Sequence, residues 1–259
     1  MEQRANSPLF RFSAPAVVQN LVLDLCGFRE CLACVGNERC TPLIEHCNIR
    51  CSGDHAVVCW GAAAPTLRVC DVSARKAGVL CLGASRPSLH ECVINACEQQ
   101  GVRAVDASWP RLERCRLVDN GAEGIVAMDN AGVEAIECTI TGSKGPGVDV
   151  SGHAHATLSG CNVADNAGGI FLWDTATAAL QTVRLAGGPH HALLADGHTR
   201  PRLRACNING DTLLLSPEAA AGVLEAGLDN VVAVSSERAT LPPELGCFKF
   251  EADRYTRKQ

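Results

Sequence analysis

The sequence predicts an all-β fold, a single-stranded right-handed parallel β-helix of about nine coils with a short C-terminal capping helix. Three observations predict it. One motif returns every 22 or 23 residues, a second short β motif follows each copy, and 47% of the 259 residues are hydrophobic although only 4% are aromatic. The apolar residues are therefore mainly Ala, Val, Leu, Ile and Cys. Such small side chains suit a narrow, regularly stacked interior.

The first motif reads Pro-x-Leu-x-x-Cys-x-Ile. It starts at Pro42 and recurs along the chain, with Val183 in the cysteine position of one copy. A degenerate earlier copy is expected around Leu23, Cys26 and Phe28. Because Leu and Cys lie three residues apart, both can face inward only if a bend or bulge separates them. The cysteines of the motif form a predicted ladder: Cys47, Cys70, Cys92, Cys115, Cys138, Cys161 and Cys206.

The second motif is a glycine followed by alternating apolar positions, as in Gly101–Ala104 and Gly147–Val150. Alternation places Val102 inside, and it places Arg103 and Asp149 outside. A period with two β motifs is too rich in strands for a helical repeat. The leucine-rich frame Leu-x-x-Leu-x-Leu is also missing.

This pattern resembles the right-handed parallel β-helix repeat family, whose usual coil reads Ile-x-x-Asn-x-Ile followed by Gly-Ile. Cysteine here takes the place of the family's asparagine. The resemblance covers about residues 21–215 and is nearest in character to intracellular eukaryotic β-helices, such as the β-helix region of F-box proteins and of Shc-binding spindle proteins. It implies the fold and says little about function. Without an F-box-like helical segment before the repeats, a complete ubiquitin-ligase receptor is not expected.

The ends depart from the repeat, as end coils of solenoids must if their open strand edges are to be covered. We expect an N-terminal arm or cap at residues 1–20, the β-helix at 21–215, a cap of helix plus strand at 216–239 and a tail at 240–259. The helix begins with Ser216 as its N-cap.

The tail carries Phe248, Phe250 and Tyr255, and we expect it to pack back or to meet a partner. The other candidate binding residues are Trp60, Trp109 and Trp173, since tryptophan is enriched at interaction hot spots. Covering of turns is an equally good account of these three tryptophans.

No catalytic residue is expected. Asp106, Asp129 and Asp174 each follow a second-motif glycine by five residues, and Asp is a preferred turn residue. The alternative is a carboxylate pair, Asp106 and Asp129, on adjacent coils with Arg103 nearby. Paired acids serve glycoside hydrolases and calcium-dependent lyases.

No metal site and no cofactor are expected. The denser cysteine group, Cys26, Cys31, Cys34 and Cys40, partly matches iron–sulfur and zinc spacings. Packing of thiols in the first coils is the simpler account, since buried cysteine behaves as a small hydrophobe.

Charge and composition narrow the partners. A net charge of −5 without a basic stripe disfavours nucleic acid, and no stretch is apolar enough to predict a membrane span. Sixteen cysteines without a secretory signal indicate reduced thiols in the cytoplasm or the cytoskeleton, with organellar import as a weaker alternative.

The expected function is a non-catalytic scaffold or protein-recognition module in an intracellular assembly, cytoskeletal or ciliary in type, with other proteins as partners. The alternative is a carbohydrate-active enzyme, either a polysaccharide lyase or a glycoside hydrolase.

Overall fold

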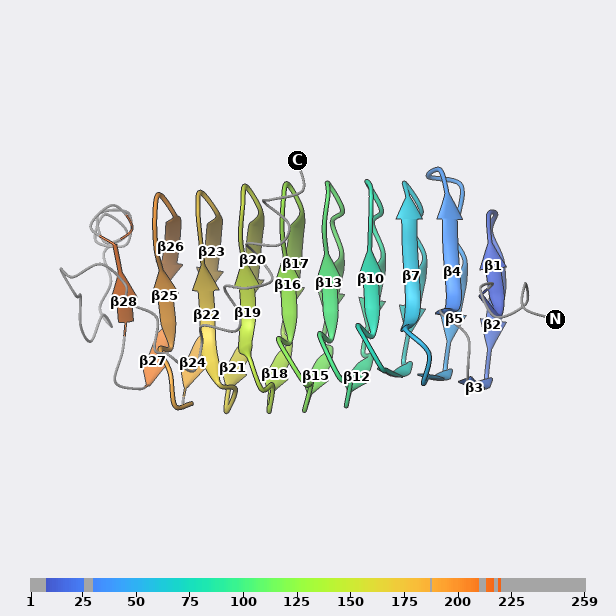
Figure 1. Cartoon of the computed structure of the whole chain (residues 1–259), viewed down its shortest axis with the longest axis horizontal. Coiled ribbons are helices and arrows are strands. Elements are labelled where there is room, and N and C mark those ends of the chain that lie inside the picture. Colours follow the sequence, from blue (N-terminus) through green and yellow to red (C-terminus); the bar gives the residue numbers. More distant parts are fainter. Residues whose placement is uncertain (1–7, 26–29, 187, 210–212, 217–218, 220–259) are drawn as a thin grey trace.

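The computed structural model describes residues 8–25, 30–186, 188–209, 213–216 and 219. These residues form an all-β parallel solenoid of about eight turns, whose coils lie side by side in one row from the N-terminal coil to the C-terminal one (Figure 1). Each coil passes through three sheets in turn, and every strand pairs in parallel with its equivalent in the next coil. The expectations of a strand-rich repeat, parallel pairing and coil stacking are confirmed, whereas the number of turns is about eight and not the expected nine.

Sheet A receives the second sequence motif, and sheets B and C share the first. In the described residues, sheet A consists of β1 (Phe10–Phe12), β4 (Glu30–Gly36), β7 (His55–Gly61), β10 (Val79–Cys81), β13 (Val102–Ala104), β16 (Ile125–Ala127), β19 (Pro146–Val150), β22 (Gly168–Leu172), β25 (Leu193–Ala195) and β28 (Leu213–Leu215). Sheet B consists of β2 (Val17–Gln19), β5 (Leu43–Glu45), β8 (Thr66–Arg68), β11 (Ser88–His90), β14 (Arg111–Glu113), β17 (Gly132–Ile136), β20 (His155–Ser159), β23 (Thr177–Gln181) and β26 (Arg200–Arg204). Sheet C consists of β3 (Val22–Leu25), β6 (Asn48–Cys51), β9 (Asp71–Ala74), β12 (Val93–Asn95), β15 (Arg116–Val118), β18 (Thr139–Thr141), β21 (Asn162–Ala164), β24 (Arg184–Ala186) and β27 (Asn207–Asn209).

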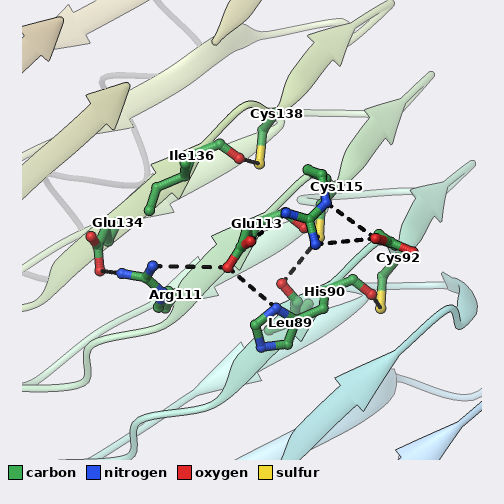
Figure 2. Close-up of polar contacts among 11 residues, drawn as sticks. Leu89, His90, Cys92, Arg111, Glu113, Cys115, Glu134, Ile136 and Cys138 are labelled. Atoms are coloured by element: carbon green, nitrogen blue, oxygen red, sulfur yellow. Dashed lines mark hydrogen bonds and ion pairs between the residues drawn. The ribbon is translucent and has the colours of Figure 1, made fainter. Parts of the chain in front are cut away.

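A sharp bend separates sheet B from sheet C, as the Leu-x-x-Cys spacing requires. The residue before each ladder position has a left-handed backbone, for example Val69 (φ 51°), Glu91 (φ 53°) and Arg114 (φ 51°). The following thiol donates to the carbonyl two residues back, and Cys92 Sγ lies 3.4 Å from the oxygen of His90 (Figure 2). The bend turns both Leu and Cys inward, and the same bend repeats along the solenoid.

The interior is built from columns of equivalent side chains, one from each coil. Leu89 and Leu112 pair in sheet B, Ile94 and Leu117 pair in sheet C, and all four are fully buried. Val102 is also fully buried in sheet A, as the alternation predicts. These columns form one continuous hydrophobic core.

The first coil differs from the sequence prediction. Leu23 pairs with Ile49, and Val18 pairs with Ile44. The earlier copy therefore has Leu21, not Cys26, in the ladder position, because the first spacing is longer than 22 or 23 residues. Within the segment expected to be an arm or cap, β1 and β2 are end strands of sheets A and B.

The C-terminal cap is described only at its start. The hydroxyl of Ser216 accepts a hydrogen bond from the backbone N–H of Ala219 at 3.2 Å, which is the contact an N-cap residue makes. The rest of the expected helix, the strand at Val231–Val234, and the tail residues Phe248, Phe250 and Tyr255 lie outside the described residues.

Candidate functional site

A groove with a volume of about 460 Å³ lies on the outer side of sheet A, near β7, β10, β13 and β16. Apolar side chains from three successive coils line it, namely Leu80, Leu82, Val105 and Met128. Its polar lining residues are His55, Lys76, Gln99, Arg103, Asp106 and Asp129. The carboxylate pair and the arginine that the sequence singled out therefore meet in one concave surface.

Much of the apolar lining comes from one repeat position, the residue directly after the inward pair of each sheet A strand. Successive coils stack there through backbone hydrogen bonds. The N–H of Leu82 donates to the carbonyl of Cys59 at 2.8 Å, and the N–H of Met128 donates to that of Ala104 at 3.0 Å. The row along the solenoid is Trp60, Leu82, Val105, Met128, Ser151 and Trp173.

Two of the three candidate tryptophans thus share this row. Trp60 is 56% exposed and directly precedes Leu82 in it. Trp173 stands five coils further along, or about 24 Å at the usual strand spacing. Trp109 lies elsewhere: its ring packs over Gly132 and lies 6.1 Å from the ring of His155. The structure therefore does not bring the three tryptophans together.

The aspartates of the groove occupy a tight turn after sheet A. Asp106 and Asp129 both have a φ of 59°, in the left-handed region that Asp tolerates better than most residues. One oxygen of Asp106 accepts from the N–H of Gly83 at 2.8 Å, and one oxygen of Asp129 accepts from the N–H of Asp106 at 3.2 Å. Asp174 makes the same bond to Gly152 at 3.0 Å. The expected turn role of these aspartates is confirmed, and each carboxylate caps the turn of the preceding coil.

The opposite end of the groove holds Lys76 and His55. Lys76 Nζ lies 3.1 Å from a carboxylate oxygen of Asp54. Burial lowers the pKa of His55, and the nearby positive charges of Lys76 and Arg103 lower it further. His55 Nδ1 accepts a hydrogen bond from the N–H of Ala77 at 3.2 Å, so neutral His55 carries its proton on Nε2. The groove thus offers donors at one end and carboxylates at the other.

A second titratable group lies further along sheet A. Asp149 occupies the outward position between Val126 and Phe171, as the alternation predicts. Burial raises the pKa of its carboxyl to about 8, the negative charges of Glu123 and Asp174 contribute, and a hydrogen bond from Trp173 opposes the shift. Although Asp149 is on the outer row, its carboxyl is therefore largely withdrawn from water.

The described members of the dense cysteine group, Cys31, Cys34 and Cys40, do not converge on one point. Cys31 Sγ donates to the carbonyl of Arg50 at 3.2 Å and Cys40 Sγ to that of Phe12 at 3.3 Å, while Cys34 pairs with Cys59 inside sheet A. Cys26 lies outside the described residues. Among the residues that the structure describes, no cluster of three His, Cys, Asp or Glu side chains could hold a metal ion.

The described cysteines are all buried and none is in a disulfide. Cys34, Cys59 and Cys81 form a second stack, which the sequence analysis missed because their spacing is 25 and then 22 residues. Burial raises the pKa of Cys97 to about 11. By contrast, a hydrogen bond from Cys31 lowers the pKa of Cys51 to about 6, and one from Cys92 lowers the pKa of Cys70 to about 7.

The groove itself was also not predicted from the sequence. Lys76, His55 and Met128 carry no motif of their own. The available signal was the recurrence of large apolar residues, such as Leu82 and Met128, at one position of the period.

No helix in the described part of the chain has the length and hydropathy needed for a membrane span. No curated protein and no solved structure matches the chain. A family model described as a right-handed β-helix region matches residues 28–163 and again residues 133–236. Together these matches cover well over half of the sequence, and the chain belongs to the right-handed β-helix family.

Proposed function

We propose that this protein is a non-catalytic recognition module that binds an extended segment of a partner protein in the groove beside sheet A. The observation that carries the proposal is the aliphatic lining of the groove: Leu80, Leu82, Val105 and Met128 come from three consecutive coils. A continuous apolar strip of this kind on a soluble surface is typical of a protein interaction site.

The residues around the strip favour polypeptide over sugar. Carbohydrate sites commonly offer the ring faces of Phe, Tyr or Trp, and none of the described residues that line the groove is one of these. Methionine adapts to different side chains and is over-used at peptide-binding surfaces. Trp60, exposed and next to Leu82 in the same row, would extend the contact as an anchor.

The charges at the two ends of the groove set the kind of segment that fits. Lys76 and Arg103 favour an acidic residue, and Asp106 and Asp129 favour a basic one further along the groove, with apolar residues between. The proposed ligand is an extended segment with apolar residues between unlike charges.

The proposal places the module in an intracellular assembly, in the cytoplasm or on the cytoskeleton, with proteins as partners and neither nucleic acid nor membrane as a ligand. The described cysteines, which are buried and in no disulfide, support a reducing compartment. The proposal also includes a relationship between this chain and the β-helix regions of F-box proteins and of Shc-binding spindle proteins.

The test compares the proteins that co-purify with the full-length wild type and with a Leu82→Glu/Met128→Glu variant. We expect the variant to lose its partners and to keep a wild-type circular dichroism spectrum and melting temperature. Val118→Glu, on the outer side of sheet C, is the matched control and should retain them. Retention of every partner by the groove variant would refute the proposal.

A second candidate function is a carbohydrate-active enzyme. The observation that favours it is the convergence of Asp106, Asp129 and Arg103 with Lys76 and His55 in one groove. Paired acids could hydrolyse a glycosidic bond, or a base beside neutralising groups could support elimination. Against it, one oxygen of each carboxylate already accepts a backbone N–H.

Incubation with acidic polysaccharides separates the two functions. Depolymerisation by the wild type, abolished in a folded Asp106→Asn/Asp129→Asn variant, would establish the enzyme. We expect no depolymerisation, and we expect the double variant to bind partner proteins as the wild type does.

A further inference from the structure

The outer surfaces of the three sheets differ in polarity. On sheet A the strand register places Ala33, Val58, Leu80, Val126, Phe171 and Leu194 in one outward row, which Arg103 and Asp149 interrupt. The corresponding positions of sheets B and C are mostly polar or charged. A solenoid can leave its outer faces in water, so an apolar row on one face of it needs a cover.

The row is closed from solvent where it is most apolar. Leu194 is 0% exposed and Phe171 is 1% exposed, although Ile170 and Leu193, their inward neighbours in sequence, fill the interior on the other side of the sheet. Trp173, with its ring centroid 6.2 Å from that of Phe171, shields one edge of that ring. At β10 and β13, by contrast, the outward side chains Leu80 and Arg103 are half-buried and line the open groove.

We propose that the C-terminal segment, residues 220–259, packs back across the outer face of sheet A over β19, β22 and β25. This inference is independent of the proposed function, whose groove lies over β7 to β16.

The point at which the chain leaves the solenoid supports this occupant. β28 is the last described strand of sheet A and pairs with β25, so the chain departs beside Leu194. Ser216 fixes this exit, because its N–H donates to Ala195 at 2.8 Å and its hydroxyl donates to Gly197 at 2.8 Å. The segment therefore starts at the edge of the face it would cover.

The length of the segment is sufficient. About 40 residues follow position 219, and an extended chain spans about 3.3 Å per residue, or more than 100 Å in all. The path from β28 to β19 crosses three strand spacings, roughly 14 Å. The segment could therefore form its own turns and still reach Asp149.

The composition of the segment complements the face. Phe248, Phe250 and Tyr255 are large enough to cover Phe171 and Leu194. The last twelve residues hold four basic side chains against two acidic ones. The negative charges of Glu123 and Asp174 act on that face, close enough to Asp149 to raise its pKa. Apolar contact and charge both favour this segment over the polar faces of sheets B and C.

Photocrosslinking of the full-length protein tests the inference. Benzoylphenylalanine replaces Phe250, and an equal mixture of ¹⁴N- and ¹⁵N-labelled chains is irradiated and digested. We expect crosslinks within one chain, from position 250 to peptides that contain Val148–Leu172 or Leu193–Ala195. A Phe248→Ser/Tyr255→Ser background should lower their yield at least several-fold, while Glu251→Gln is the control and should preserve it.

Every other outcome overturns the inference. Crosslinks only between differently labelled chains would make a second copy the cover, and crosslinks confined to sheet B, sheet C or the segment itself would place the segment elsewhere. Absence of any crosslink would show that position 250 touches no part of the solenoid. Fluorescence provides a second measurement in a Trp60→Phe/Trp109→Phe protein: emission from Trp173 should shift to the red in the Phe248→Ser/Tyr255→Ser background, and an unchanged spectrum would contradict the contact.

Discussion

The outer faces of sheets A and B are built on the same kind of interior and yet present opposite surfaces. Behind both, columns such as Val102–Ile125 and Leu89–Leu112 are fully buried. Outside, sheet A carries the apolar row and the groove, whereas sheet B carries a network of charges. Arg111 Nη2 lies 3.8 Å from Glu113 Oε2, and the same oxygen lies 3.5 Å from His90 Nδ1 (Figure 2).

This comparison separates what holds the solenoid together from what it can bind. Stacking of inward columns needs only small apolar residues at the right period, and it leaves the outer positions free to vary. On sheet B those positions are hydrated ion pairs, which typically contribute about 0–1 kcal/mol each. On sheet A they include apolar side chains that gain by being covered. Binding is therefore expected on sheet A.

The shared interior gives the largest expected effect. Ile125→Asp would place a charge in a fully buried column, at a cost of several kcal/mol, and should unfold the central coils. Arg103→Ala, on the outer side of the adjacent strand, should change the free energy of unfolding by less than about 1 kcal/mol. Urea denaturation of both variants checks this. A similar loss of unfolding free energy in both variants would mean that the inner and outer faces are wrongly assigned.

Asp149 gives a pH-dependent effect on the sheet A side. Its pKa is raised from an ordinary 3.8 to about 8, so the fold favours the neutral carboxyl. Stability from this group is complete below pH 4, declines as the pH rises, and is lost above about pH 8. Asp149→Asn should therefore have a larger free energy of unfolding than wild type at pH 8.5, by roughly a few kcal/mol, and a higher melting temperature there. At pH 4 the two proteins should melt nearly alike. A constant difference at both pH values would contradict the raised pKa.

The turn that borders the groove gives a smaller effect. Asp129→Ala removes the acceptor for the N–H of Asp106 and puts alanine at a φ of 59°, which should cost roughly 1–2 kcal/mol. Asp129→Asn keeps an oxygen acceptor and tolerates the left-handed backbone, so thermal melts should show most of the wild-type stability. Equal destabilisation by both substitutions would show that the charge, not the turn geometry, matters.

The sheet B network gives the smallest effect. Arg111→Ala removes ion pairs to Glu113 and Glu134 on a surface where Arg111 is 40% exposed. We expect a loss of less than about 1 kcal/mol, further reduced in 1 M salt. Partner binding should not change. Loss of partners in this variant would indicate that the recognition surface lies on sheet B and not on sheet A.

The sequence by itself determined the period, and with it the solenoid, the inward columns and the outward positions of Arg103 and Asp149. It could do so because every coil repeats the same local conformation, including the bend before each ladder cysteine. The spacing of the motif along the sequence therefore also gives the position of each residue in the stack. The turn role of Asp106 and Asp129 followed from residue preference for the same reason.

Only the tertiary structure decided which side chains of different coils meet. The ladder position of the first coil moved to Leu21 because the spacing there departs from the period, and Asp129 caps Asp106 of the neighbouring coil, not its own turn. His55, Lys76 and Asp129 line the same groove, although more than three repeat periods separate the first from the last in the sequence. Contacts of this kind depend on the register between strands and on the reach of each side chain across a strand spacing, and neither quantity is encoded in the repeat motif.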